Sequence, residues 1–151
     1  MSNSRRGFLV QAAAVQDALS AVIVAELPDG VPCSVGYPAG GLQAEHIWIS
    51  GEFDATLPRY VSGGLQRDES GEVEVRISVV WSAADMAGPR DRALELSQYV
   101  EDAISLDPTL DGTVEEAHVA SARGNEAAPD EHSRQYALIM RVAYQTTVVL
   151  S

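Results

Sequence analysis

Hydrophobic and polar residues alternate strictly in one stretch near the middle of the chain. The apolar positions are Val73, Val75, Ile77, Val79 and Trp81, and polar residues fill most positions between them. Side chains in a strand point to opposite faces in turn, so this pattern predicts a strand over 72–82 with one buried face.

Two other stretches repeat their apolar residues at helical spacing. In the segment 90–105 these residues are Ala93, Leu96, Val100, Ala103 and Ile104, and in the segment 7–26 they are Phe8, Leu9, Ala12, Val15, Leu19, Val22 and Ile23. The turn-forming residues 28–30 end the first of these segments. We expect two helices, each with an apolar stripe that packs on the sheet.

Further extended segments complete the predicted sheet. They span 32–37, 46–53, 56–63 and 113–122, and a closing strand carries Tyr136, Leu138, Met140, Val142 and Tyr144 on one face. The polar, glycine-containing stretches 63–71 and 124–132 are predicted to be mobile loops. The prediction is therefore an α+β fold in one domain, 1–151, with one mostly antiparallel (mixed) sheet of about four to five strands packed by two helices.

The same periodicities identify the residues that we expect in the core. The sheet side consists of Val73, Val75, Ile77, Val79, Trp81, Tyr136, Leu138, Met140 and Val142, and the helix side of Phe8, Val15, Leu19, Leu96 and Val100. At 151 residues, 46% of them hydrophobic, the chain can bury such a core without disulfides or metals.

The chain is strongly acidic, with a net charge of -12, and all ten cationic side chains are arginine. Nine acids and one arginine lie between Glu101 and Glu131, a local net charge of -8. Such a surface repels a phosphate backbone, because tight DNA binding needs cations that displace counterions. We therefore do not expect a DNA-binding regulator.

The sequence also bears on where the protein resides. Cys33 is the single cysteine and cannot form an internal disulfide, and the most apolar stretch, 18–25, is shorter than the ~20 residues of a membrane span. Residues 2–8 resemble a twin-arginine export start, but Gln11, Gln16 and Asp17 follow, which favours a helix of the mature protein. We expect a cytoplasmic setting and no membrane partner.

Few residues suggest chemistry. The histidines His46, His118 and His132 lack the spacing of a helical metal pair, and His46 and His132 are interpreted as titrating surface imidazoles. Cys33 has apolar neighbours and is interpreted as a small buried residue. We predict no catalytic, cofactor-binding or metal-binding residue. The alternative is a small soluble α+β enzyme or ligand-binding domain, with its site in a pocket between the helices and the sheet.

Six acids are candidates to face a partner or a lumen: Asp68, Glu69, Glu101, Asp102, Glu115 and Glu116. Glu101 and Asp102 fall near the end of the second predicted helix, where the helix dipole favours cations by roughly 0.3–1 kcal/mol each. Acids at this place suggest a surface that faces a partner or passing DNA. A solvated edge in an acid-rich protein explains them equally well.

Several segments along the chain are similar to one family of viral proteins. They are residues 26–32 after the first helix, Val35-Gly36-Tyr37-Pro38, Val79-Val80-Trp81-Ser82, Arg92-Ala93-Leu94-Glu95-Leu96, and the helix-to-strand segment from Ala103 to Val114. With this layout, the chain resembles the tail terminator proteins of long-tailed (siphovirus-type) bacteriophages, particularly those of actinobacterial hosts.

The resemblance implies a virion structural protein without catalytic activity or cofactor. Its subunits would form a ring, usually a homohexamer, that caps the tail tube, stops its polymerisation and joins the tail to the head-completion or connector proteins. Its partners would be further copies of itself, the tail-tube protein and the connector protein, with DNA passing through the lumen without specific binding. Its place would be the head-proximal end of the tail, after synthesis in the host cytoplasm. Another head–tail connector, a tail-tube component and a monomeric adaptor remain alternatives.

Overall fold

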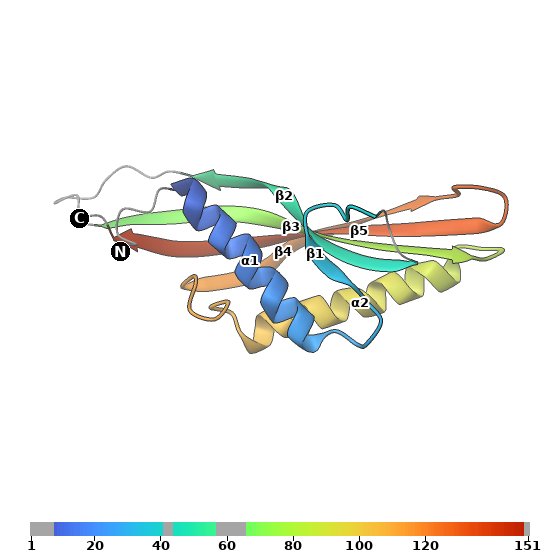
Figure 1. The fold of residues 1–151 in the computed structure, drawn as a ribbon, viewed down its shortest axis with the longest axis horizontal. Helices are drawn as coiled ribbons and strands as arrows, with labels where there is room; N and C mark the ends of the chain where they lie inside the picture. The colour runs from blue at the N-terminus through green and yellow to red at the C-terminus, as the bar shows by residue number, and fades with distance from the viewer. Residues whose placement is uncertain (1–7, 41–43, 57–65, 150–151) are drawn as a thin grey trace.

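The computed structural model describes residues 8–40, 44–56 and 66–149 and contains two helices and five strands (Figure 1). Their order is α1 (Phe8–Glu26), β1 (Cys33–Val35), β2 (Glu45–Thr56), β3 (Gln66–Ser82), α2 (Ala87–Leu106), β4 (Glu116–Ala127) and β5 (Ser133–Val149). The α+β class predicted from the sequence is confirmed.

All five strands form one mixed sheet in the order β1-β2-β3-β5-β4. The short β1 pairs with β2 in parallel, and every other pairing is antiparallel. β3 and β5 are 17 residues each and pair along their whole length, from Gln66↔Val149 to Ser82↔Ser133. At about 3.3 Å per residue these strands extend for roughly 55 Å, which explains the elongated shape in Figure 1.

Both helices lie on the same face of the sheet. α1 contacts β1 and β2, α2 contacts β3, β4 and β5, and the two helices also contact each other (Figure 1). We call this the covered face; on β3 it carries Val73, Val75, Ile77 and Val79. The opposite, open face carries Glu72, Glu74, Arg76 and Ser78 on β3, and no helix packs on it in the described part of the chain.

The core fills the space between the helices and the covered face. The residues predicted for it that are at least 95% buried are Val15, Leu19, Val73, Val75, Ile77, Val79, Leu96, Val100, Leu138, Met140 and Val142. Trp81 and Tyr136 are only partly buried and pack against this cluster. The side chain of Phe8 lies outside the described residues.

The first predicted loop is wrong over residues 66–71, because β3 begins at Gln66 rather than near residue 72. All of these residues pair with β5, and Ser70 and Gly71 also pair with β2, so neighbouring strands supply their backbone hydrogen bonds. Gly71 is not a turn residue. A Cβ there would lie 2.6 Å from the hydroxyl of Tyr144, its partner on β5, so the glycine makes room for that ring. Residues 63–65, and the strand predicted over 56–63 beyond Thr56, lie outside the described residues.

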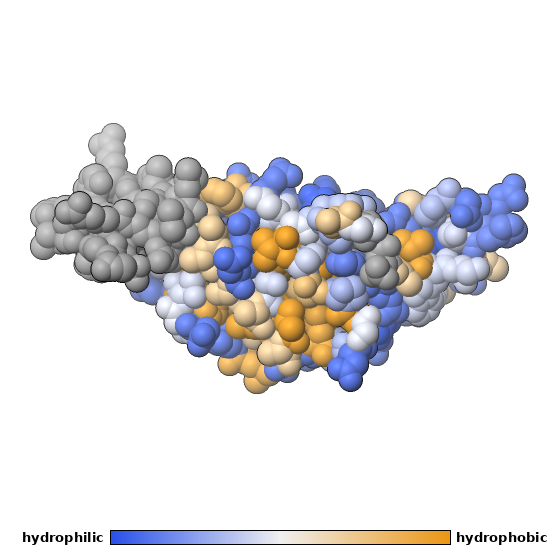
Figure 2. Space-filling view, in the orientation of Figure 1, coloured by the Kyte–Doolittle hydropathy of each residue, from blue (hydrophilic) through white to orange (hydrophobic). Residues whose placement is uncertain are grey.

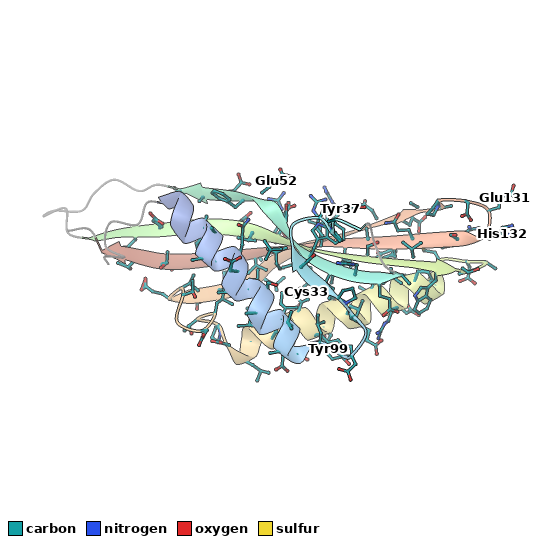
Figure 3. All side chains as sticks on the ribbon, in the orientation of Figure 1. Cys33, Tyr37, Glu52, Tyr99, Glu131 and His132 are labelled. Atoms are coloured by element: carbon teal, nitrogen blue, oxygen red, sulfur yellow. The ribbon has the colours of Figure 1, made fainter. Side chains whose placement is uncertain are left out.

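The second predicted loop is wrong over residues 124–127, which belong to β4. The strand is longer than the 113–122 segment suggests, and a register shift between Val119 and Ser121 explains the weak alternation there. The ring of Tyr136 occupies the position of the missing side chain at Gly124, so this glycine also serves close packing within the sheet. Only residues 128–132 connect β4 to β5. Glu131 and His132 lie at the end of this hairpin (Figure 3), where the surface is mainly hydrophilic (Figure 2).

Candidate functional site

Two of the six candidate acids meet at one end of the sheet. The Thr147 hydroxyl lies 3.0 Å from Oδ1 of Asp68 and 2.7 Å from Oε1 of Glu115, and can donate to either. Both acids are exposed, and with Glu69, Ser70 and neighbouring residues they line a hollow of about 350 Å³. Asp68 and Glu115, 47 positions apart in the sequence, thus form a joint acidic surface where β3 begins.

Glu69 is not a surface residue, contrary to its prediction as a ring- or lumen-facing acid. It is 2% exposed because it continues the covered-face alternation of β3, two positions before Gly71. Its cross-strand partner Thr146 is 6% exposed. Burial, with the charge of Glu69 as a smaller contribution, raises the pKa of the Tyr144 phenol, so these groups share one polar region at the end of the core.

Glu116 lines a second hollow on the open face. This cavity of about 400 Å³ crosses β2, β3, β5 and β4 and also contains Asp54, Glu72 and His118. Asp54 and Glu72 are not among the candidates predicted from the sequence. The polar phase of the β3 alternation could have indicated Glu72, whereas Asp54 becomes its neighbour only through the β2–β3 register.

Glu101 and Asp102 lie apart from the other four acids, in a groove between α2 and β4. The groove has a volume of about 430 Å³ and is lined by Gln98, Glu101, Asp102, Ile104, Ser105, Pro108, Ala117, His118 and Val119. Nε2 of Gln98 donates to Oδ1 of Asp102 at 2.8 Å, one helical turn away. His118 lines both this groove and the open-face cavity, so the two hollows are neighbours across β4.

Five of the candidate acids form no ion pair within the described residues, whereas several other acids do. Within the described residues, the arginines that form ion pairs are Arg76, Arg90, Arg92 and Arg141. Their partners are Glu45, Glu72, Glu74, Asp91 and Glu95. In this part of the chain, no ion pair reaches Asp68, Glu101, Asp102, Glu115 or Glu116. The exposed acids selected from the sequence therefore remain uncompensated within the described structure.

His46 is buried, contrary to its interpretation as a surface imidazole. It is 4% exposed, and neither ring nitrogen has a hydrogen-bond partner among the described residues. It lies on the open face beside Trp48, against which Tyr37 packs edge-on with ring centroids 5.5 Å apart. Burial lowers the pKa of His46, which favours the neutral ring. His132 is exposed, as expected.

Cys33 is half-buried beside α1, and its thiol lies 3.9 Å from the Ser20 hydroxyl. Burial raises the pKa of this thiol and outweighs the opposing effect of Ser20. The protonated form is therefore favoured, whereas a nucleophilic cysteine needs the thiolate.

The described residues contain neither a metal-ligand cluster nor a helix that could span a membrane. Among them, no three His, Cys, Asp or Glu side chains are grouped so that they could hold a metal ion. Neither described helix is both long and apolar enough to cross a bilayer.

The chain matches no known family model and no curated protein. Among solved structures, it is similar to a chain of the "Virion of native gene transfer agent (GTA) particle". The match has 16% sequence identity and a TM-score of 0.35, and covers 90% of this chain and 94% of that one. A TM-score this low establishes neither a common fold nor a common role.

Proposed function

We propose that this protein is a virion structural protein: the tail terminator ring subunit of a long-tailed bacteriophage. In this role it caps the tail tube, stops its polymerisation and joins the tail to the head-completion or connector proteins. The proposal starts from the resemblance of the segments around residues 26–38, 79–82, 92–96 and 103–114 to that family. The structural observation that carries it is a five-stranded sheet in which β1 and β4 are the edge strands, with no further strand beside either of them in the described residues.

The two edges of the sheet differ greatly in length. β1 has 3 residues, whereas β4 has 12, and most of its side chains from Glu116 to Ala127 are exposed. An edge strand presents unpaired backbone donors and acceptors that can pair with another chain. A contact between unlike edges is head-to-tail, and repeated head-to-tail contacts close into a ring when the rotation permits. This supports a ring of identical subunits.

The acidic surface supports the passage of DNA through the lumen of such a ring. Asp68, Glu115 and Glu116 are exposed at the same end of the sheet and have no ion pair within the described residues. Lining a lumen, such carboxylates would repel the DNA backbone and prevent it from adhering during passage. The role requires no chemistry from the subunit.

The mass of the purified protein in solution tests the proposal, first alone and then with tail-tube subunits. We expect a closed species, six times the 16.1 kDa chain for a hexamer, in at least one sample. A closed ring keeps one mass as concentration rises, whereas an open head-to-tail polymer continues to grow. A monomer in both samples would contradict the ring and favour the adaptor or ligand-binding alternative.

A further inference from the structure

We propose that the groove between α2 and β4 binds a basic segment of another protein, in which arginine or lysine lies next to aliphatic side chains. The proposal rests on the shape of the groove, its apolar floor and its charge. It goes beyond the ring, because a subunit could bind such a segment in any oligomeric state.

The groove has an apolar floor that is already in place in the single chain. Ile104 and Ala117 are 2% and 3% exposed, and the half-buried Val119 continues the floor along β4. The backbone N–H of Ala117 donates to the carbonyl of Pro108 at 2.8 Å, which ties β4 to the segment that follows α2. A preformed groove loses little conformational entropy when a partner binds.

An exposed leucine lies one helical turn from the rim of the groove. Leu106, the last residue of α2, is 72% exposed, the highest value among the large hydrophobic side chains that the structure leaves exposed. It follows Asp102 by four residues, so it lies on the same side of α2 as this residue of the groove. An aliphatic side chain of a partner would remove this surface from water at roughly 25 cal/mol per Å².

The rim of the groove is negative. Glu101 and Asp102 are exposed near the C-terminal end of α2, whose last turn has no basic residue. The partial negative charge of the helix end adds to the two carboxylates. No arginine pairs with either acid within the described residues. A cationic side chain in the groove would meet both acids and the helix end.

The charge of the chain favours a different protein over a second copy. Four of the described arginines already form ion pairs, and Arg134 donates to the carbonyls of Asp130 and Ser133. Arg123 is an exposed residue of β4, in a stretch of the sequence that also holds the exposed acids Glu126, Asp130 and Glu131. A chain with a net charge of -12 therefore offers few free cations to the two carboxylates of the groove. We therefore assign the groove to a basic partner.

A labelled peptide of alternating leucine and arginine is a direct probe. Its affinity for the full chain can be measured by fluorescence anisotropy, beside a peptide in which uncharged citrulline replaces each arginine. We expect the arginine peptide to bind at least about tenfold more tightly, and its binding to weaken as salt is added.

Two double variants with equal charge changes locate the binding. Glu101→Gln with Asp102→Asn removes the rim charges, and Glu126→Gln with Glu131→Gln removes two exposed charges near the distant hairpin tip (Figure 3). We expect about tenfold weaker binding for the groove variant and less than twofold change for the hairpin variant. On addition of peptide, amide NMR shifts should concentrate at Ile104, Ala117 and Val119.

Three results would overturn the assignment: no binding of the arginine peptide, equal losses in the two variants, or NMR shifts away from the groove. A change in oligomeric mass caused by the groove variant alone would also overturn it, because the groove would then lie between copies. Peptide binding by a strict monomer would support the groove while contradicting the ring, so the two proposals fail separately.

Discussion

The two faces of the sheet are built on the same strands but differ in what stabilises them. On the covered face, Val73, Val75, Ile77 and Val79 are all 0% exposed beneath the helices. On the open face of β3 and β5, the side chains of Glu72 and Arg141 are 40% and 47% exposed and form an ion pair at 3.2 Å. Exposed pairs of this kind contribute little to stability, whereas each buried aliphatic side chain contributes about 1.5–3 kcal/mol. The covered face therefore holds the fold, and the open face is free to carry charge for a partner.

A carboxylate and an imidazole depart from this division. Glu69 is buried on the covered face, and His46 is buried on the open face. Glu69 continues the covered-face phase of β3 but falls in a segment that the sequence predicts as a loop, and nothing in the alternation of β2 shows that His46 is buried. Substitutions on the two faces, and at these two exceptions, test how far the comparison holds.

The largest effect is expected for Ile77→Asp. A carboxylate at this fully buried position would have no counterion in the core, and we expect a loss of at least about 4 kcal/mol in unfolding free energy. That loss is close to the total stability of many domains, so the variant should show no cooperative thermal transition by circular dichroism. Ser121→Asp, which places the same group at an exposed position on β4, is the control and should melt like the wild type. A normal melting curve for Ile77→Asp would contradict the placement of Ile77 on the covered face.

The elements with strong apolar periodicity could be predicted from the sequence. α2 and the central part of β3 combine a regular repeat with large aliphatic side chains, and the structure places them as expected. α1 is apolar around most of its circumference, and it too forms where it was predicted. Residues 66–71 and 124–127 could not be predicted, because their strand conformation depends on pairing with distant segments. Gly71 and Gly124 look like turn residues until the rings of Tyr144 and Tyr136 occupy the space beside them.

The candidate acids show a similar limit. The charge of Glu101 and Asp102 at a helix end is visible in the sequence, but the apolar floor beside them requires β4 to pack against α2. The pairing of Asp68 with Glu115 through Thr147 depends on the β3–β5 register. Burial separates Glu69 from Asp68, although the two are adjacent and similar in chemistry.

The neighbours Glu69 and Asp68 provide the second prediction. Glu69→Lys reverses a charge that is 2% exposed, next to Thr146 and Tyr144, and we expect it to lower the unfolding free energy by about 2–4 kcal/mol. Asp68→Lys makes the same reversal at the neighbouring exposed position and should change stability by less than about 0.5 kcal/mol. Urea denaturation of both variants measures the difference. Equal stability of the two variants would show that Glu69 is accessible in solution.

The smallest effect concerns pH and His46. Burial lowers the pKa of this imidazole in the folded protein, whereas its pKa in the unfolded chain is about 6.5. As the pH falls through that value, His46 binds a proton in the unfolded chain but stays neutral in the folded protein. The contribution of His46 to stability is therefore present at neutral pH and is lost progressively in acid.

His46→Leu should remove this contribution to the pH dependence, because leucine does not titrate. The measurement is the unfolding free energy in urea at about pH 7.5 and about pH 5.5, for the wild type, His46→Leu and the control His132→Leu, which changes an exposed imidazole at the hairpin tip (Figure 3). We expect the wild type and the control to lose stability in acid and His46→Leu to lose less. An equal loss in all three would mean that the His46 ring reaches water on the open face. Such access would make the open face beside Trp48 more solvated than the 4% exposure of His46 indicates.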